Sequence, residues 1–353
     1  MNTNRVQLFF ILVIFISACG TESDPDPIEW KGSWKEMGFL GESISAVEAF
    51  DELLFVSGSG QIFRQNLAEN VINWKGVGVE FDPEIAEVSD LLYSEFGFYS
   101  VIRSLPGIND LPLDFKTLYI STDQGDSWSH IEISNMERRV RPHVMVELAV
   151  CCNHILYGLS GFLYKSEDEG ATWKILDHRG APRFLYLSPD HPNQIWLGGQ
   201  TNILTPHIEM SDDYGENWQS LNDKITDNPL NEGRVYSVII SPNDEKMVLS
   251  GLSGRVRKSV DGGKSWETVL GGYSILTFAN STVHSDRVFA SGISPQGVLF
   301  VAVSDNYGDS WQIEQYPESP DEMYVNDMAV TTFEGEEVVY LGTNRGVYGF
   351  RLL

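Results

Sequence analysis

The sequence has 353 residues, of which 42% are hydrophobic, and it includes 32 glycines, 15 prolines and 3 cysteines. Its 50 acidic and 24 basic side chains give a formal net charge of −26, and a field of that sign repels nucleic acids and anionic lipid surfaces. We therefore expect neither DNA nor RNA as a partner.

The N-terminal segment has the features of an export signal. Arg5 precedes an unbroken apolar run from Leu8 to Ile16, which is too short to span a bilayer as a helix but suits a signal peptide. The run leads through Ile-Ser-Ala into Cys19, a sequence that resembles the lipobox of bacterial lipoproteins. The resemblance implies that residues 1–18 are a signal peptide and that the thiol of Cys19 carries lipid. The alternative is an ordinary signal peptide followed by a chance cysteine.

The next stretch, residues 19–29, is short, acidic and rich in proline. Such a segment cannot bury apolar surface, so it is predicted to be a lipidated tether. Gly20 stands where well-studied lipoproteins of the inner membrane have Asp, so the resemblance implies the outer membrane. No other apolar run in the sequence is long enough to cross a bilayer. We expect a lipid-anchored protein of the cell envelope, with periplasmic and surface-exposed orientations both open.

A repeated motif dominates the rest of the chain. Five segments share the spacing Ser-x-Asp-x-Gly-x-(Ser/Thr)-Trp and recur at nearly equal intervals, with Asn217 and Asn306 as the two departures. The Asp or Asn, Gly and Trp positions are Asp123, Gly125 and Trp128; Asp168, Gly170 and Trp173; Asp213, Gly215 and Trp218; Asp261, Gly263 and Trp266; and Asn306, Gly308 and Trp311.

Each residue type in the motif has a structural reason. The Asp carboxylate can accept hydrogen bonds from backbone amides of a turn, and glycine allows positive φ. The tryptophan ring can pack into the apolar layer between neighbouring sheets. We therefore expect a tight turn between the third and fourth strands of each unit, with a structural role and no catalytic one.

The strand pattern predicts how many units there are. Short β-rich runs separated by Gly, Asn, Asp and Pro give four strands per unit. A weak first unit ends at Trp74 without Asp or Gly in the motif positions, and the last unit lacks an outer strand that the segment around Trp34 can supply. This predicts an all-β domain over residues 30–353, a seven-bladed β-propeller of four-stranded antiparallel blades in which the N-terminal strand closes the last blade. Six blades is the alternative, if the first unit is an insertion.

The motifs resemble the Asp-box, or bacterial neuraminidase repeat, of sialidases, the sortilin ectodomain, xyloglucanase-type glycosidases and the propellers related to photosystem II assembly factors. The resemblance covers nearly all of the chain after the tether. It implies the propeller fold, with the Asp-box turns on the face opposite the ligand site. It leaves the function open, because this scaffold hosts unrelated activities.

Function is therefore expected in loops that join an outer strand to the next inner strand, or a second strand to a third. The loops that exceed a minimal turn are Ile133–Val144, Asp177–Arg183, Asn222–Arg234 and Phe98–Lys116.

A glycosidase is the enzymatic alternative to a binding module. Sialidases carry an early Arg-Ile-Pro motif that holds the first of three arginines, and this tripeptide does not occur in the sequence. Asp110 and Asp114 could form a catalytic pair, but among 50 acidic residues we expect them to be solvated loop residues. No catalytic residue is assigned. We favour a non-enzymatic binding or assembly module over a sialidase-like or polysaccharide-active hydrolase and over a glycan-binding accessory lipoprotein.

A local excess of positive charge interrupts the acidic background. Arg138, Arg139, Arg141 and His143 precede the third inner strand, Arg179 and Arg183 the fourth, and Arg234 the fifth. Our hypothesis is a basic patch at the channel mouth that binds an anionic glycan, a peptide carboxylate or an acidic protein. The alternative is ordinary ion pairing with surface carboxylates.

The adjacent Cys151 and Cys152 are interpreted as small apolar residues at a strand end, with a strained vicinal disulfide as the alternative. The sequence contains no matching set of ligands for a metal site, and no cofactor is expected. The expected partner is an envelope protein or a glycan whose identity stays open, and the protein is expected to be monomeric.

Overall fold

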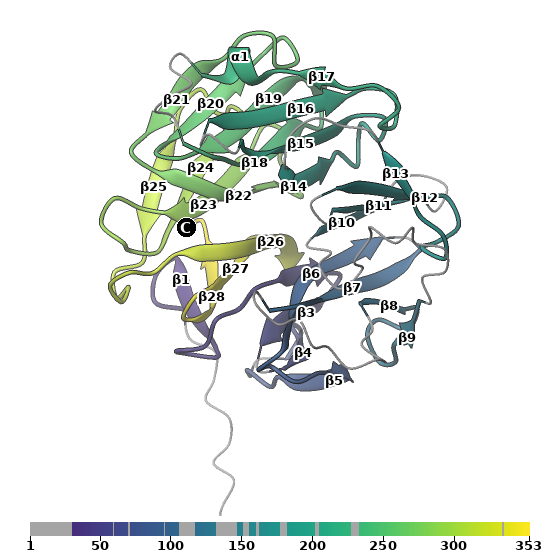
Figure 1. Ribbon diagram of the computed structural model, residues 1–353. Helices are drawn as coiled ribbons and strands as arrows, with labels where there is room; N and C mark the ends of the chain where they lie inside the picture. The colour runs from purple at the N-terminus through teal and green to yellow at the C-terminus, as the bar shows by residue number, and fades with distance from the viewer. Residues whose placement is uncertain are drawn as a thin grey trace, which may run out of the picture.

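The computed structural model describes residues 30–353 except 59, 70, 95, 106–116, 132–146, 151–154, 160–161, 177–181, 202–204, 227–232 and 334. In this part the chain forms seven four-stranded antiparallel sheets and one short helix, and the sheets stand like blades around a central axis (Figure 1). The prediction of seven blades is confirmed. The six-blade alternative is wrong, because the weak first unit forms a complete blade.

The first four blades follow the chain in order. Blade 1 contains β2 (Val47–Phe50), β3 (Leu53–Gly58), β4 (Gln61–Asn66) and β5 (Lys75–Glu80). Blade 2 contains β6 (Ala86–Ser94), β7 (Gly97–Ser104), β8 (Leu118–Ser121) and β9 (Ser129–His130). Blade 3 contains β10 (Glu147–Val150), β11 (Leu156–Leu159), β12 (Leu163–Ser166) and β13 (Lys174–Leu176). Blade 4 contains β14 (Pro182–Leu187), β15 (Ile195–Gln200), β16 (Pro206–Ser211) and β17 (Gln219–Ser220), and α1 (Asn222–Ile225) follows it.

The last three blades complete the ring. Blade 5 contains β18 (Val235–Ser241), β19 (Asp244–Leu252), β20 (Arg255–Ser259) and β21 (Glu267–Gly271). Blade 6 contains β22 (Ser274–Asn280), β23 (Val288–Ile293), β24 (Phe300–Ser304) and β25 (Gln312–Gln315). Blade 7 contains β26 (Val325–Phe333), β27 (Glu336–Thr343), β28 (Gly346–Arg351) and, as its outer strand, β1 (Trp34–Gly38).

The first strand of blades 1 to 6, and β26 of blade 7, is the inner strand. Each inner strand contacts the inner strand of the next blade, and the contact between β26 and β2 closes the ring. On the outside of blade 7, Trp34 of β1 pairs with Phe350 of β28, which confirms the predicted closure by the N-terminal strand.

The core is divided among the blade interfaces. Within the described residues the buried apolar side chains form seven clusters, and each cluster lies between two neighbouring blades. Burial of apolar area between sheets is thus the main force that holds the ring together.

The Asp-box turns have the structure that the motif predicts. In blade 2 the Ser127 amide donates to Asp123 Oδ1 at 2.8 Å and the Ser127 hydroxyl donates to Oδ2 at 2.5 Å. Gly125 has a φ of 81°. The two departures keep these contacts: the Asn217 side chain donates to Asp213 Oδ2 at 2.6 Å, and Asn306 Oδ1 accepts from the Ser310 amide at 2.9 Å. The turn needs an acceptor at the third motif position, and either Asp or Asn supplies it.

Three predicted loop boundaries are wrong. Phe98 lies in β7, Arg183 lies in β14, and Asn222 begins helix α1. Phe98 is buried at 1% exposure in the cluster between blades 1 and 2, so packing extends the strand into the expected loop.

Candidate binding site in the central channel

Two cavities lie side by side along the axis of the ring. The first, of about 340 Å³, is bounded by β2, β6, β22 and β26. The second, of about 280 Å³, is bounded by β14, β18, β22 and β26. Asp327 lines both cavities, and β22 and β26 contribute to both, so the two spaces are neighbours in the central channel.

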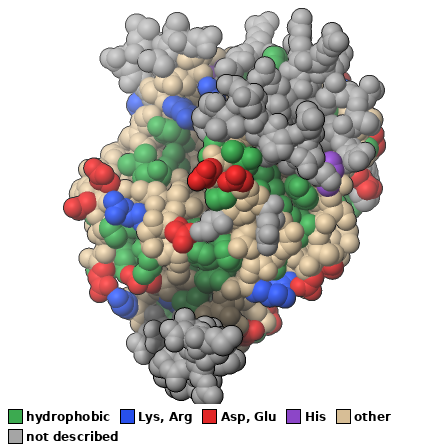
Figure 2. Space-filling view, turned by 60° about the horizontal axis from the view of Figure 1, so that its bottom comes forward, with side chains coloured by type: hydrophobic (Ala, Val, Ile, Leu, Met, Phe, Trp, Pro, Cys, Tyr) green, Lys and Arg blue, Asp and Glu red, His purple; other side chains and the backbone are tan. Residues whose placement is uncertain are grey.

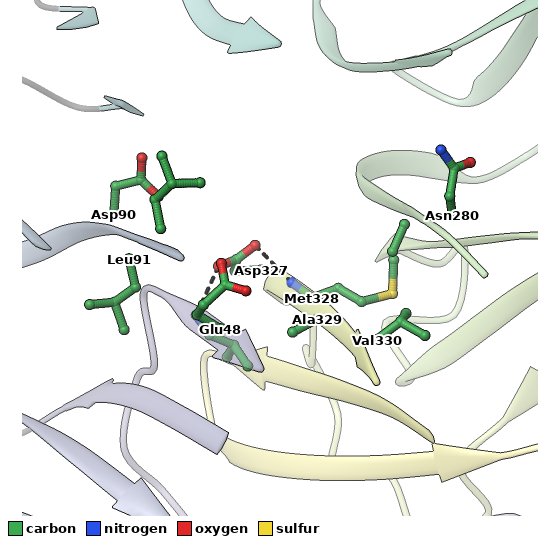
Figure 3. Close-up of a pocket in the computed structure, with 11 residues that line it drawn as sticks. Glu48, Asp90, Leu91, Asn280, Asp327, Met328, Ala329 and Val330 are labelled. Atoms are coloured by element: carbon green, nitrogen blue, oxygen red, sulfur yellow. Dashed lines mark hydrogen bonds between the residues drawn. The ribbon is translucent and has the colours of Figure 1, made fainter. Parts of the chain in front are cut away.

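Three carboxyl groups line the first cavity. Glu48 comes from β2, Asp90 from β6 and Asp327 from β26, which are the inner strands of three consecutive blades. In Figure 3 the carboxyl groups of Glu48 and Asp327 lie next to each other, and that of Asp90 projects from the neighbouring strand. All three residues are half-buried.

β-Bulges place the two aspartates. The pairing of β6 with β7 shifts between Val88 and Asp90, and the pairing of β26 with β27 shifts between Val325 and Asp327. One extra residue in each inner strand re-aims the residue that follows it. Each bulge therefore turns an aspartate toward the next blade and the cavity.

The aspartates bond to the backbone of the next blade. Asp327 Oδ2 accepts from the Val47 amide at 2.8 Å, and its Oδ1 accepts from the Met328 amide at 2.8 Å. Asp90 Oδ2 accepts from the Leu148 amide at 2.7 Å. Glu48 Oε1 accepts from the adjacent Ala49 amide at 3.2 Å. The aspartates thus join blades as well as line the channel.

Burial and mutual repulsion disfavour the charged forms of these groups. Burial, and then the charges of Asp327 and Asp90, raise the pKa of Glu48 to about 8. Burial raises the pKa of Asp90 to about 8 and that of Asp327 to about 6. No basic side chain among the described residues forms an ion pair with any of the three. The cavity therefore favours protonated carboxyl groups, most strongly at Glu48 and Asp90.

Aromatic residues lie around the second cavity, whose exposed lining is mostly polar. They are Phe184, Tyr186, Tyr236 and Phe278, with the aliphatic Leu276 beside them. Phe184 is only 5% exposed and belongs to the apolar cluster between blades 4 and 5. The Tyr186 hydroxyl accepts from the Ile240 amide at 3.4 Å, so this ring is held in place.

The structure places two of the predicted basic residues beside this second cavity. Arg234 directly precedes β18, and its guanidinium carbon lies 5.3 Å from the ring centre of Tyr236. Arg183 is the extra residue of the bulge between Pro182 and Phe184; it is exposed, and its stem runs beside Gly199.

The remaining predicted site residues fall in segments that the structure does not describe. They are Cys19, Arg138, Arg139, Arg141, His143 and Arg179, and the pair Cys151 and Cys152 lies there as well.

Sequence reasoning missed the channel carboxylates. Glu48 stands inside the otherwise apolar inner strand β2, and Asp327 directly precedes the apolar run Met328 to Val330 of β26, and that placement is the signal by which they could have been found. Among the described residues, no three or more His, Cys, Asp or Glu side chains are arranged to hold a metal ion. No helix in the described part is long and apolar enough to span a membrane.

The described outer surface mixes both charges. On the face in Figure 2, acidic and basic side chains are interspersed, with apolar side chains between them. Several of the bases are paired, for example Arg64 with Asp126 at 2.7 Å and Arg103 with Glu87 at 2.6 Å. The unpaired carboxyl groups inside the channel differ from this pattern.

Comparisons with known proteins agree with the architecture. The BNR/Asp-box repeat model matches residues 119–130, which contain the motif of blade 2. No curated protein sequence is significantly similar to the chain. A solved structure of YCF48 bound to D1 peptide is similar at 14% identity and a TM-score of 0.64, over 93% of this chain and 99% of that chain. YCF48 from Cyanidioschyzon merolae is similar at 14% identity and a TM-score of 0.62, over 91% and 99%.

A GH74 enzyme from Niastella koreensis is also similar, at 14% identity and a TM-score of 0.62, over 90% of this chain but only 53% of that chain. Likenesses at such low identity show the fold alone. The chain is thus a β-propeller that carries Asp-box repeats.

Proposed function

We propose that this Asp-box propeller is a non-enzymatic binding module that holds a segment of an envelope protein in its channel, while a lipid on Cys19 anchors it to the outer membrane. The observation that carries the proposal is the pair of cavities that meet at Asp327. Concave spaces of this size with convergent polar groups are a usual form of a binding site.

A protein segment suits the channel better than a glycan does. An extended peptide presents polar backbone groups along its whole length, and the channel presents a mostly polar lining that includes the carboxyl groups of Glu48, Asp90 and Asp327. The similar YCF48 structure is bound to a D1 peptide, and the present chain covers 99% of that chain. This likeness supports a peptide ligand without identifying it.

The basic residues are proposed to contact acidic groups of the same segment at the rim. Arg234 and Arg183 lie beside the second cavity, where the inner strands β18 and β14 begin. A guanidinium group can bond both oxygens of a carboxylate at once. The five other predicted basic residues, from Arg138 to Arg179, belong to the same proposal.

Site-specific photo-crosslinking in cells tests the proposal. A benzophenone amino acid at Phe278, on the channel wall, should form an adduct with a partner protein. The same probe at Val260, which is 59% exposed on the Asp-box turn of blade 5, is the control and should form none. The pair of changes Arg183→Ala and Arg234→Ala should reduce the adduct without lowering the melting temperature.

Equal adducts at both positions would contradict a channel site. The absence of any adduct, together with arginine-dependent binding on a glycan array, would show that the ligand is a glycan.

A polysaccharide hydrolase is the second candidate, because two neighbouring carboxyl groups, of which Glu48 has the more strongly raised pKa and Asp327 the less, are the kind of pair that glycoside hydrolysis uses. Against it, both oxygens of Asp327 accept backbone hydrogen bonds, and the chain spans only 53% of the similar GH74 enzyme. Release of reducing ends from envelope polysaccharides by the wild type, lost in Glu48→Gln, would establish this candidate in place of the first.

A further inference from the structure

We propose that the partner held in the channel also docks on a small surface at the rim, formed by Leu40, Tyr324 and Arg345, through an apolar side chain that stands next to a carboxylate. We call these three residues the closure surface, because they lie where blade 7 meets blade 1. The inference rests on the proposed function and specifies a second contact of the same ligand.

Three connections between strands supply the closure surface, and all three lie at the same end of the ring. Leu40 follows the outer strand β1, Tyr324 directly precedes the inner strand β26, and Arg345 lies in the turn between β27 and β28. Because the strands of a blade are antiparallel, the outer-to-inner and second-to-third connections meet at one end. Arg234 precedes β18 at this same end, which is the side of the ring where function is expected.

Hydrogen bonds tie the three connections together. The Gly41 amide donates to the Arg345 carbonyl at 3.1 Å. The Tyr324 amide donates to Asn344 Oδ1 at 3.0 Å, and the Asn344 amide donates back to the Tyr324 carbonyl at 3.2 Å. Bonds to the single turn of Asn344 and Arg345 thus hold Leu40 and Tyr324 in one patch with Arg345.

The turn that carries Leu40 has an unusual backbone conformation. Phe39 has a φ of 55°, in the left-handed region that bulky side chains rarely adopt. Its ring is fixed against those of Phe63 and Trp74, at centroid distances of 4.8 and 5.2 Å. The packed Phe39 therefore fixes the turn and leaves Leu40 58% exposed at its tip. An apolar residue on a backbone that is already fixed loses less entropy when it binds a partner.

The residue types define the chemistry of the partner. Tyrosine and arginine are among the residue types that most often carry binding energy at protein interfaces, and Tyr324 is 38% exposed. Arg345 is also exposed, and it forms no ion pair within the described part of the chain. A guanidinium group bonds both oxygens of a carboxylate, and apolar neighbours exclude water from that contact. The complementary partner presents an apolar side chain beside an acidic one.

The closure surface is continuous with the channel, which is why we assign both to one partner. Asn326 lines the second cavity, and its side-chain amide donates to the Ile44 carbonyl at 2.9 Å. Ile44 lies in the segment that carries Leu40, and its amide donates to the carbonyl of Thr343, close to Arg345 in the chain, at 2.8 Å. A segment that leaves the second cavity can therefore pass directly onto the closure surface. Two linked contacts bind one ligand more tightly than either does alone.

The test extends the photo-crosslinking experiment. A benzophenone amino acid at Leu40 should form an adduct with the same partner that the probe at Phe278 captures. Val260 is the matched control, because it is 59% exposed and lies on the Asp-box turn of blade 5, at the opposite end of the ring. A probe there should form no adduct. Mass spectrometry should place the Leu40 adduct close to an acidic residue of the partner.

Two double variants connect the binding to the side chains. Leu40→Ser with Arg345→Gln should reduce the adduct formed from Phe278 by about fivefold or more, since both changes remove interface contacts. Val260→Ser with Lys264→Gln makes the same kinds of change at the opposite end and should leave that adduct unchanged. All four side chains are exposed, so neither double variant should lower the melting temperature. An arginine in place of the partner's acidic residue should restore the adduct that Arg345→Glu loses.

The absence of an adduct at Leu40, or a different partner there from that at Phe278, would overturn the inference. An unchanged Phe278 adduct in the Leu40→Ser and Arg345→Gln protein would also overturn it, and would leave the binding module standing. Conversely, an adduct at Leu40 that is lost in Arg345→Gln, without any adduct at Phe278, would support the closure surface and count against the channel as the site.

Discussion

The carboxylate of Asp327 on β26 accepts a hydrogen bond of 2.8 Å from the backbone amide of Val47 on β2, a residue 280 positions earlier in the chain. This bond crosses from blade 7 to blade 1, the two blades that meet where the ring closes. One side chain thus bonds across the closure and also lines both channel cavities. The stability of the ring and the chemistry of the channel are therefore coupled.

Stability should fall as the pH rises from about 5 to about 8.5. Glu48 and Asp90 have folded pKa values of about 8, well above those of free carboxyl groups, so between these limits the folded protein binds more protons than the unfolded chain. This contribution is fully present below the unfolded pKa and is lost as the pH rises through the folded one. We expect the free energy of unfolding to fall by about 2 kcal/mol, since the half-buried groups retain some solvent. Urea titrations across this range measure it.

Glu48→Gln is the control for that slope, because an uncharged amide has no proton to lose. The variant should lose part of the pH dependence. A wild-type stability that rises or stays constant over the same range would contradict the raised pKa values.

Asp327→Ala should destabilise the fold by about 1–3 kcal/mol, because the amide of Val47, a residue only 3% exposed, loses its acceptor. Asp327→Asn keeps one carbonyl oxygen and should cost less. Denaturant unfolding of both variants at pH 5, where repulsion among the carboxyl groups is small, isolates the hydrogen bond. Equal stability of Asp327→Ala and the wild type would show that the bond adds nothing to ring closure.

Trp173→Ala should cost about 3–5 kcal/mol, because it removes a large ring that is 8% exposed and donates to the Gly170 carbonyl at 2.8 Å. Trp218→Ala should cost less, since that tryptophan is half-buried. Thermal melting measures both. A Trp173→Ala protein with an unchanged melting temperature and no partner binding would mean that the Asp-box tryptophan is a binding residue.

Cys19→Ala should release the protein from membranes, because a lipid on Cys19 is the anchor that we propose. Metabolic labelling with a fatty-acid analogue, followed by fractionation, measures this. Ser17→Thr, which changes a neighbouring residue and leaves the thiol, is the control. Equal labelling of the alanine variant and the wild type would refute lipidation at this position.

The fold could be predicted because its signal is local and repeated. Each Asp-box motif contains its own turn, so the spacing of tryptophans such as Trp128 and Trp173 reports the blade length directly. Asn217 and Asn306 did not obscure the pattern, and the structure explains why, since both keep the hydrogen bonds of the turn.

The channel could not be predicted in the same way, because it arises where different blades meet. No local pattern indicates that Asp327 reaches Val47, and a bulge of one residue decides where the aspartate points. The bulge in β14 likewise moved Arg183 from an expected loop into a strand. The alternation of apolar and polar residues along a strand does not predict the direction of side chains that depend on such shifts in register.

The placement of β1 in blade 7 has a consequence for how the chain folds. In the other six blades all four strands are contiguous in sequence, so each can form from local contacts, which are fast. β1 precedes every other strand described, and its partner β28 follows all of them. β1 therefore cannot pair until β28 has formed. Until then Trp34 stays exposed, because its contact with Phe350 of β28 does not yet exist. Ring closure is therefore a late step of folding. A chain truncated before β28 leaves the apolar edge of blade 7 exposed, and proteases and chaperones can recognise such an edge.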